Sequence, residues 1–164
     1  MSNPIPILNE IEAEFIRGAL LADVRFLVIG GHAVNFYIQD YRLMREVKDL
    51  DLFYSTDRKN VQRLVSYLKS VNVWHPKLTI ERLSRPNSVI AIQAPVGVDL
   101  ISQIAAVSFE EAWVERDIGY HRVGKIPVIS LAHLLESKRA SGRRQDLNDV
   151  TLLQKHQEST AQAS

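Results

Sequence analysis

The sequence predicts an α/β (α+β) protein, in which a mixed β-sheet is flanked by helices. Helical and strand-like periodicities alternate along the chain, as is typical of a sheet covered by helices. Two strand-like stretches, LTIERLS and SVIAIQA, are separated only by the turn-forming residues RPN, which predicts an antiparallel hairpin. We expect one domain over residues 1–157 and a flexible polar tail at 158–164, because 164 residues leave little room for a second domain.

The first half of the chain is expected to form five elements. In order, they are a helix at 7–23, a buried strand at 24–31, a short helix at 32–39, a strand at 48–55 and an amphipathic helix at 57–71. The first helix is predicted from an apolar stripe made by Ile7, Leu8, Ile11, Phe15 and Leu20. Asp57 is the expected N-cap of the last helix.

The second half is expected to contain more strands. In order, its elements are strands at 78–84, 88–94 and 96–102, a helix at 108–117, strands at 118–124 and 125–130, and helices at 130–142 and 143–156. Ser108 and Ser130 precede two of these helices as N-caps, and Gly142 ends one of them. Trp74 and Trp113 are expected to be core or interface anchors.

The composition is that of an ordinary globular protein, with 46% hydrophobic and 24% charged residues. Twenty basic and 19 acidic residues give a net charge of only +1, so global charge favours neither nucleic acid nor membrane as a partner. The absence of cysteine excludes disulfides, thiol catalysis and cysteine-ligated metals. The chain starts without a signal-peptide pattern and its apolar runs are short, so we expect a cytoplasmic protein.

Two aspartates lie within the strand predicted at 48–55, in the stretch REVKDLDLFY. Because strand side chains alternate between faces, Asp49 and Asp51 should point one way while Leu50 and Leu52 point the other. Aspartate is depleted from strands, and two on one face repel each other. Carboxylate oxygens at this spacing suit Mg²⁺ or Mn²⁺ held together with substrate phosphates. The alternative is a solvated strand face.

Two further features point to the same chemistry. In IGGHAV, a strand ends and a helix starts at Gly30 and Gly31, where close backbone approach and the helix N-terminus favour a phosphate. Asp99, in GVDLIS, is a third carboxylate with apolar neighbours that face away. A tight turn and a loop-capping aspartate are the respective alternatives. His32, beside the glycines, is expected to line the same pocket.

The order IGGHAV, REVKDLDLF and VDLIS resembles the nucleotidyltransferase superfamily related to DNA polymerase beta. The closer resemblance is to small bacterial nucleotidyltransferases of the minimal and abortive-infection toxin kinds, with their R-x-T-x-D-x-D strand. Arg45, Asp49 and Asp51 occupy the arginine and aspartate positions, and Val47 replaces the usual threonine. ISLAHLLESKRASGRRQDLNDV resembles the late motif of the toxin-like members, whose positions are filled by Lys138, Arg143, Asp146 and Asp149.

This resemblance implies a nucleotidyltransferase fold and an enzyme that moves a nucleoside monophosphate from an NTP, such as ATP, to a hydroxyl acceptor. Asp49, Asp51 and Asp99 would be its catalytic residues and its ligands for Mg²⁺ or Mn²⁺, and Asp99 would also take the acceptor proton. The implied nucleotide-binding residues are Gly30, Gly31, Arg45, Lys138 and Arg143.

Other roles are open for the late motif. Asp146 and Asp149 lie three residues apart on one helix face, so we expect them to pair with Lys138, Arg143 or another basic residue and position it, rather than bind metal. A solvated helix surface is the alternative for Lys138 and the neighbouring basic residues.

The acceptor remains open among RNA (such as a tRNA 3′ end), a protein side chain and a small molecule, and a toxin–antitoxin or defence role follows from the resemblance. Because the chain is short, we expect a homodimer or a partner protein to complete the acceptor side. The main alternative is a non-catalytic nucleotidyltransferase-like module that binds RNA or regulates a partner. A sugar-nucleotide glycosyltransferase is a weaker alternative, because the glycine turn and short chain do not suit it.

Overall fold

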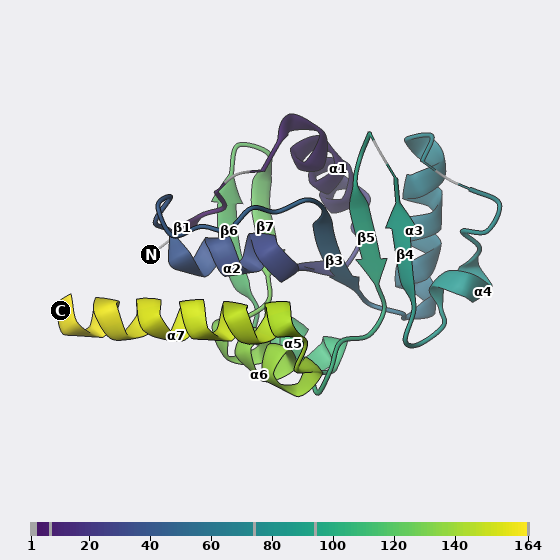
Figure 1. Cartoon of the computed structure of the whole chain (residues 1–164). Helices are drawn as coiled ribbons and strands as arrows, with labels where there is room; N and C mark the ends of the chain where they lie inside the picture. Colours follow the sequence, from purple (N-terminus) through teal and green to yellow (C-terminus); the bar gives the residue numbers. More distant parts are fainter. Residues whose placement is uncertain (1–2, 7, 74, 94, 164) are drawn as a thin grey trace.

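The computed structural model describes residues 3–6, 8–73, 75–93 and 95–163. Its centre is a seven-stranded mixed sheet with the strand order β1-β6-β7-β2-β3-β5-β4 (Figure 1). The strands are β1 (Asn3–Pro4), β2 (Phe26–Ile29), β3 (Leu50–Tyr54), β4 (Val89–Ile92), β5 (Val98–Ile101), β6 (Asp117–His121) and β7 (Gly124–Val128). The mixed sheet confirms the predicted fold class.

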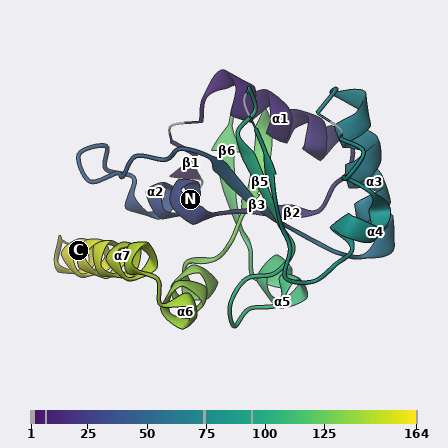
Figure 2. The same cartoon turned by 45° about the vertical axis from the view of Figure 1, so that its right-hand side comes forward.

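Helices cover both faces of this sheet. They are α1 (Glu10–Leu21), α2 (Gly30–Ile38), α3 (Arg58–Ser70), α4 (Ile80–Leu83), α5 (Phe109–Val114), α6 (Leu131–Ser141) and α7 (Arg144–Ala163). Helices α2 and α7 lie on one face, α1 and α3 lie on the other, and α5 and α6 lie at one end of the strands (Figures 1 and 2). Among the described residues, no helix is both long and apolar enough to cross a membrane.

The register between strands determines which side chains lie side by side. Ile29 pairs with Asp51 in the antiparallel β2–β3 pair, and Asp51 pairs with Asp99 in the parallel β3–β5 pair. Asp99 in turn pairs with Ala91 of the edge strand β4. Because directly paired residues point to the same face of a sheet, these four side chains form one row across four strands.

The leucines predicted to anchor the aspartate strand are in the core. Leu50 and Leu52 in β3 and Val98 and Leu100 in β5 are all at most 2% exposed, on the face opposite the aspartates. Tyr54 lies on the same buried face and donates its hydroxyl proton to a backbone carbonyl of α4 at 2.7 Å. Burying an aliphatic side chain of this size contributes about 1.5–3 kcal/mol, so the aspartate strands are firmly held from behind.

The predicted hairpin through RPN is wrong. Residues 80–83 form the short helix α4, because Thr79 caps it by accepting a hydrogen bond from the backbone N–H of Arg82 at 3.1 Å. Strand β4 instead forms an antiparallel pair with β5, and β6 pairs in the same way with β7. The apolar residues of 78–84 therefore follow a helical pattern and not the alternation of a strand.

The first helix also differs in its buried face. Ile11 is 47% exposed, and the buried residues of α1 are Glu12, Ala13, Phe15, Ile16 and Ala19. A capping box between Asn9 and Glu12 fixes where the helix begins and therefore which face turns inward. Ile7, predicted in the stripe of the first helix, and Trp74, predicted as an anchor, lie outside the described residues. Trp113 stacks on Phe109, with 5.6 Å between the ring centroids.

The last helix extends further than expected, because α7 continues to Ala163 through most of the predicted tail. Leu153 is 1% exposed, whereas residues 157–163 are all exposed.

We predict that truncation after Gln157 changes the free energy of unfolding by less than about 0.5 kcal/mol. Leu153→Ala should lower it by about 2–4 kcal/mol because it leaves a cavity. Urea denaturation measures both; a truncation as costly as Leu153→Ala would show that the distal turns stabilise the fold.

Candidate functional site

Two carboxylates lie side by side on the front face of the sheet. Asp51 is the second residue of β3 and Asp99 is the second residue of β5, and the two are direct partners in the parallel ladder. Neighbouring strands lie about 4.8 Å apart, so no other side chain of the sheet lies between those of Asp51 and Asp99. The structure thus brings together two of the three predicted aspartates through strand register alone.

Asp49 joins them from outside the strand. Strand β3 begins at Leu50, whose N–H donates to the carbonyl of Gly97 at 2.9 Å, so the prediction that both aspartates of D-x-D lie mid-strand is wrong for Asp49. Its carboxylate lies at the start of β5, because a Cβ placed on Gly97 would be 3.2 Å from its Oδ1. Asp49 is exposed, yet it lines the same pocket as Asp51 and Asp99.

The glycine turn, Gly30 and Gly31, lies in close contact with the row of aspartate side chains. Gly30 has a φ of +63°, and a Cβ there would collide with the carboxylate of Asp51. A Cβ on Gly31 would lie 2.7 Å from Cγ2 of Val47, in the segment that leads to β3. Helix α2 begins at Gly30 itself and not after the glycines, so its N-terminal amides lie beside Asp51. Backbone N–H groups at a helix N-terminus favour an anion, so the turn suits a phosphate.

The crowding of carboxylates shows in their pKa values. Burial, and then the charges of Asp99 and Asp49, raise the pKa of Asp51 to about 6, although the charges of His32 and Arg45 act in the opposite direction. Burial and the charge of Asp49 also raise the pKa of Asp99. At neutral pH the folded chain therefore holds carboxylates that repel one another, and a bound cation would relieve that repulsion.

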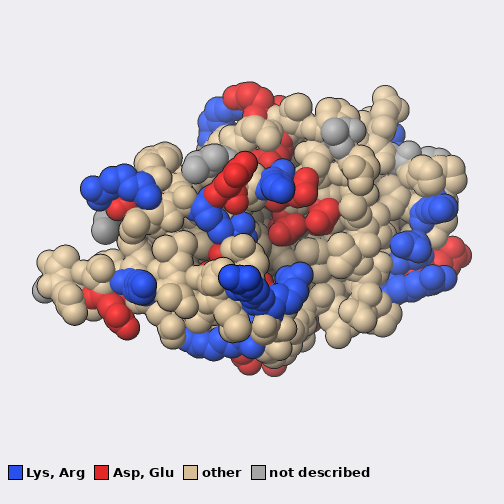
Figure 3. All heavy atoms as spheres, viewed as in Figure 1, with Lys and Arg blue, Asp and Glu red and all other residues tan. Residues whose placement is uncertain are grey.

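One pocket lies in front of the row and is called the Arg45 pocket. It has a volume of about 380 Å³ and is lined by Gly31, residues 45–49, Gln145 and the two paired aspartates. Figure 3 shows acidic side chains gathered in the middle of this face of the molecule, with basic side chains directly beside and below them. Opposite charges thus meet in one hollow.

A second pocket shares Asp51 and Asp99 with the first and is called the Lys138 pocket. It has a volume of about 360 Å³ and is bounded by Gly30, the loop after β5 and helix α6. Lys138 and Arg143 lie in its wall. The carboxylate row therefore has basic groups within both adjoining pockets, as a site for a metal-bound polyphosphate requires.

The aspartates are not arranged as a complete metal cage. Among the residues that the structure describes, no three His, Asp or Glu side chains are placed to hold a metal ion together. Their chemistry nevertheless fits Mg²⁺, because this ion usually takes one or two carboxylates and completes its octahedron with waters and substrate phosphates. Asp51 and Asp99 supply such a pair beside a turn suited to a phosphate.

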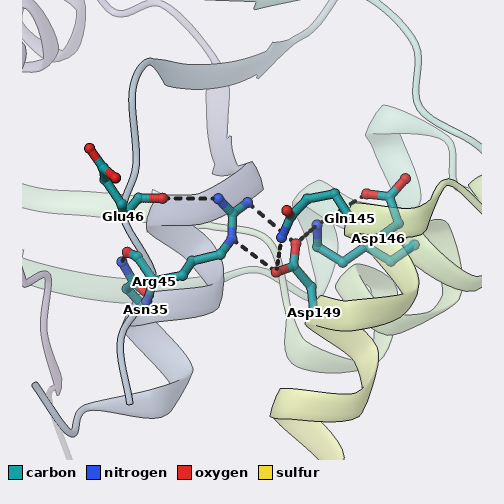
Figure 4. Close-up of polar contacts among 7 residues, drawn as sticks. Asn35, Arg45, Glu46, Gln145, Asp146 and Asp149 are labelled. Carbon is teal, nitrogen blue, oxygen red and sulfur yellow. Dashed lines mark hydrogen bonds and ion pairs between the residues drawn. The ribbon is translucent and has the colours of Figure 1, made fainter. Parts of the chain in front are cut away.

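The late motif forms a buried ionic network around Asp149, which is 1% exposed (Figure 4). Lys138 donates to its Oδ2 at 2.7 Å, and Arg45 forms an ion pair with its Oδ1 at 2.9 Å. Gln145 donates a further hydrogen bond to Oδ1 at 3.1 Å. One carboxylate of α7 therefore fixes a lysine of α6 and an arginine of the segment before β3.

Asp146, one turn before Asp149 in α7, extends this network. Its carboxylate accepts from Arg143 Nε at 2.8 Å and pairs with Lys138 Nζ at 3.4 Å. Burial favours a higher pKa for Asp146, but the hydrogen bond from Arg143 and the positive charges nearby hold that pKa below its usual range. Asp146 and Asp149 therefore pair with basic residues, as expected from their spacing.

Two buried polar residues that support segments next to the site were not recognised in the sequence. Asn35 of α2 donates to the carbonyl of Arg45 at 2.9 Å and accepts from its N–H at 3.1 Å, which fixes the backbone before β3. Its signal was a polar residue inside the apolar helix stretch AVNFY. Glu12 of α1 is buried against His32, with 3.2 Å between Oε2 and Nε2. His32, at 2% exposed, lines neither pocket, so its predicted role there is wrong.

Comparisons with known proteins give a likeness of fold among solved structures. No family model and no curated protein matches this chain. Among solved structures, the chain is similar to an antigenic nucleotidyltransferase-like protein from Paracoccidioides brasiliensis. The identity is 16%, the match covers 89% of this chain and 77% of that chain, and the TM-score is 0.49.

Carboxylate repulsion predicts a gain in stability from Asp51→Asn. The folded-state pKa of Asp51, about 6, exceeds the ordinary aspartate value of 3.8, so wild-type stability is lost as pH rises through that interval. In metal-free buffer, the stability advantage of Asp51→Asn should grow by about 2–3 kcal/mol between about pH 4 and pH 8. Urea denaturation across pH measures it, with Asp23→Asn, an exposed aspartate, as control. An advantage that does not grow with pH would contradict the proposed repulsion.

The ionic network around Asp149 predicts that Asp149→Asn lowers stability, whereas Asp51→Asn should raise it. Asp149→Asn removes the charge that compensates Lys138 and Arg45, so the free energy of unfolding should fall by about 3 kcal/mol. Asn148→Ala, on the exposed side of the same helix, should change it by less than about 0.5 kcal/mol. Thermal and urea unfolding compare the two, and equal effects would show that Asp149 does not hold the network together.

Proposed function

We propose that this chain is a metal-dependent nucleotidyltransferase of the superfamily related to DNA polymerase beta. The observation that carries the proposal is the register of β3 with β5, which sets Asp51 beside Asp99 next to the glycine turn. A purely structural sheet gains nothing from two adjacent half-buried carboxylates whose pKa values are raised by burial and by neighbouring aspartates. The ordered sequence motifs support the same assignment.

Asp51 and Asp99 would hold Mg²⁺ or Mn²⁺, and Asp49 lies close enough to act on the same charge. When bound, such ions stabilise the attacking and leaving oxygens of an in-line displacement at phosphorus. The phosphate oxygens of the NTP would complete the coordination that the carboxylates begin.

The triphosphate would be bound by backbone and basic groups around the row. Gly30 and Gly31 present the first amides of α2. Arg143 has a side chain that is 79% exposed and lies in the wall of the Lys138 pocket, so it can reach a phosphate oxygen. Arg45 and Lys138 add positive charge from the walls of the two pockets, although both are tied to Asp149.

In the transfer, the acceptor hydroxyl oxygen forms a bond to the α-phosphorus of the NTP. The bond from that phosphorus to the bridging oxygen of the β-phosphate breaks, and pyrophosphate leaves with the bonding electron pair. Asp99 would take the hydroxyl proton, for which its raised pKa suits it. Nucleoside monophosphate is thereby attached to the acceptor.

A non-catalytic module that binds nucleotide is the second candidate. It is favoured by the lack, among the described residues, of three side chains arranged around a metal position. Such a module would bind nucleotide through the glycine turn and basic residues alone, so its affinity would not depend on Asp51 or on a divalent ion.

Calorimetry with each non-hydrolysable NTP analogue tests the proposal. We predict that affinity falls at least about tenfold when Mg²⁺ is replaced by a chelator, and by a similar factor in Asp51→Asn and Asp99→Asn. The exposed Asp23→Asn serves as control and should bind as the wild type does. Equal affinity with Mg²⁺ and with chelator would sink the metal-dependent mechanism and favour the non-catalytic module.

A further inference from the structure

A third pocket lies beside the carboxylate row and is called the Phe109 pocket. It is formed by the loop after β3, the loop after β5 and the first turn of α5, and its volume is about 580 Å³. This volume is within the range of pockets that bind small molecules, which is about 300–1,000 Å³. Neither the sequence motifs nor the proposed nucleotide site accounts for it.

The Phe109 pocket adjoins the Lys138 pocket, which contains part of the carboxylate row. Gln103 and Ile104 line both it and the Lys138 pocket, and Asp51 and Asp99 line the Lys138 pocket. The two pockets therefore adjoin at the loop after β5, and a molecule that extends from the Phe109 pocket past this loop enters the pocket that contains Asp99. This is the position from which an acceptor would approach a nucleotide bound at the row.

The charge of the Phe109 pocket differs from that of its neighbours. Its only charged lining residues among those described are two acids, Asp57 and Glu110, whereas each of the other two pockets contains both basic and acidic groups. Glu110 is paired with Arg25 at 3.3 Å, with both side chains partly solvated. Asp57 precedes α3 as its N-cap, yet its side chain makes no capping hydrogen bond. The carboxylate of Asp57 is therefore available to a ligand.

The walls of the pocket are preformed. Phe109 packs edge-on against Phe53 at 5.2 Å and stacks on Trp113, so its ring is held on two sides. The loop after β5 contains Ala106 with a φ of +64°, a conformation rare for a residue with a Cβ. Such strain persists where surrounding structure imposes it, often at ligand sites. A capping box at Ser108 fixes the end of the same loop.

We propose that the Phe109 pocket binds the acceptor of the transfer, and that this acceptor is a small hydroxyl compound carrying an ammonium group. This inference rests on the proposed nucleotidyltransferase function. A nucleic-acid acceptor would bring phosphates against the carboxylate of Asp57, where like charges repel, while Arg25 already offsets the charge of Glu110. An ammonium group would instead meet these carboxylates, and the polar side chains of Thr56 and Gln103 are placed to bond hydroxyl groups.

Three probes of similar shape and different charge test the proposal by NMR titration of isotope-labelled protein. D-glucosamine carries hydroxyls and an ammonium group, D-glucose is neutral, and glucose 6-phosphate is anionic. We expect glucosamine to shift the backbone amides of residues 103–107 saturably and to bind at least about threefold more tightly than glucose. Glucose 6-phosphate should give no saturable shifts there. Equal binding of all three probes, or no binding of glucosamine, would overturn the proposal.

Variants link the binding to the acidic residues. Asp57→Asn should weaken glucosamine about three- to fivefold while keeping a residue that caps helices well. Glu110→Gln, on the other side of the pocket, is a second variant with a similar expected loss. Glu115→Gln removes an exposed acid that follows α5 outside the lining and should leave binding unchanged. Unchanged binding in both Asp57→Asn and Glu110→Gln would also overturn the proposal.

A titration with Mg²⁺ and an NTP analogue in the same sample separates this inference from the proposed function. Shifts at Gly30 and Gly31 together with glucosamine shifts at 103–107 support both. Nucleotide shifts without glucosamine shifts overturn the acceptor pocket alone. Glucosamine shifts without nucleotide shifts overturn the proposed function, and with it the acceptor role of the pocket.

Discussion

Repulsion between Asp51 and Asp99 is the constraint around which the site is built. Their direct pairing in the β3–β5 ladder leaves them no freedom to separate, because the leucines and valine beside them are locked in the core. Burial, and then the charges of Asp99 and Asp49, raise the pKa of Asp51 to about 6. A fold that keeps such a pair gives up stability at neutral pH, and under the proposed function this loss would be exchanged for activity.

The positive charge that surrounds the row is held in place by α7. Asp149 binds Lys138 and Arg45 together, so the last helix, helix α6 and the segment before β3 share one buried carboxylate. Asn35 fixes the backbone of that segment from α2. Since a buried charge is tolerated only when it is paired, loss of one member would disturb the others. The C-terminal helices are thus part of the site although they lie outside the sheet.

Local patterns in the sequence predicted the elements that carry the site, and tertiary context decided the rest. The alternation around Asp51 and Asp99 identified their strands, because apolar neighbours on the opposite face reveal a half-buried strand. Register cannot be predicted from one sequence, so the direct pairing of these aspartates and the exclusion of Asp49 from β3 became visible only in the structure. LTIERLS was misassigned because a capped single turn and a short strand share the same apolar content.

The ionic network around Asp149 leaves the two basic residues of the late motif, Lys138 and Arg143, with different access to a ligand. Lys138 is 7% exposed and already bonds two carboxylates, so a phosphate could claim it only by displacing one of them. Arg143 shares only Asp146 and leaves most of its guanidinium in solvent at the edge of the Lys138 pocket. Because a planar guanidinium can bond carboxylate and phosphate at once, Arg143 would be the better contact for a nucleotide under the proposed function. Lys138 would then hold Asp146 and Asp149 in place beside Arg143 and would not itself contact the nucleotide.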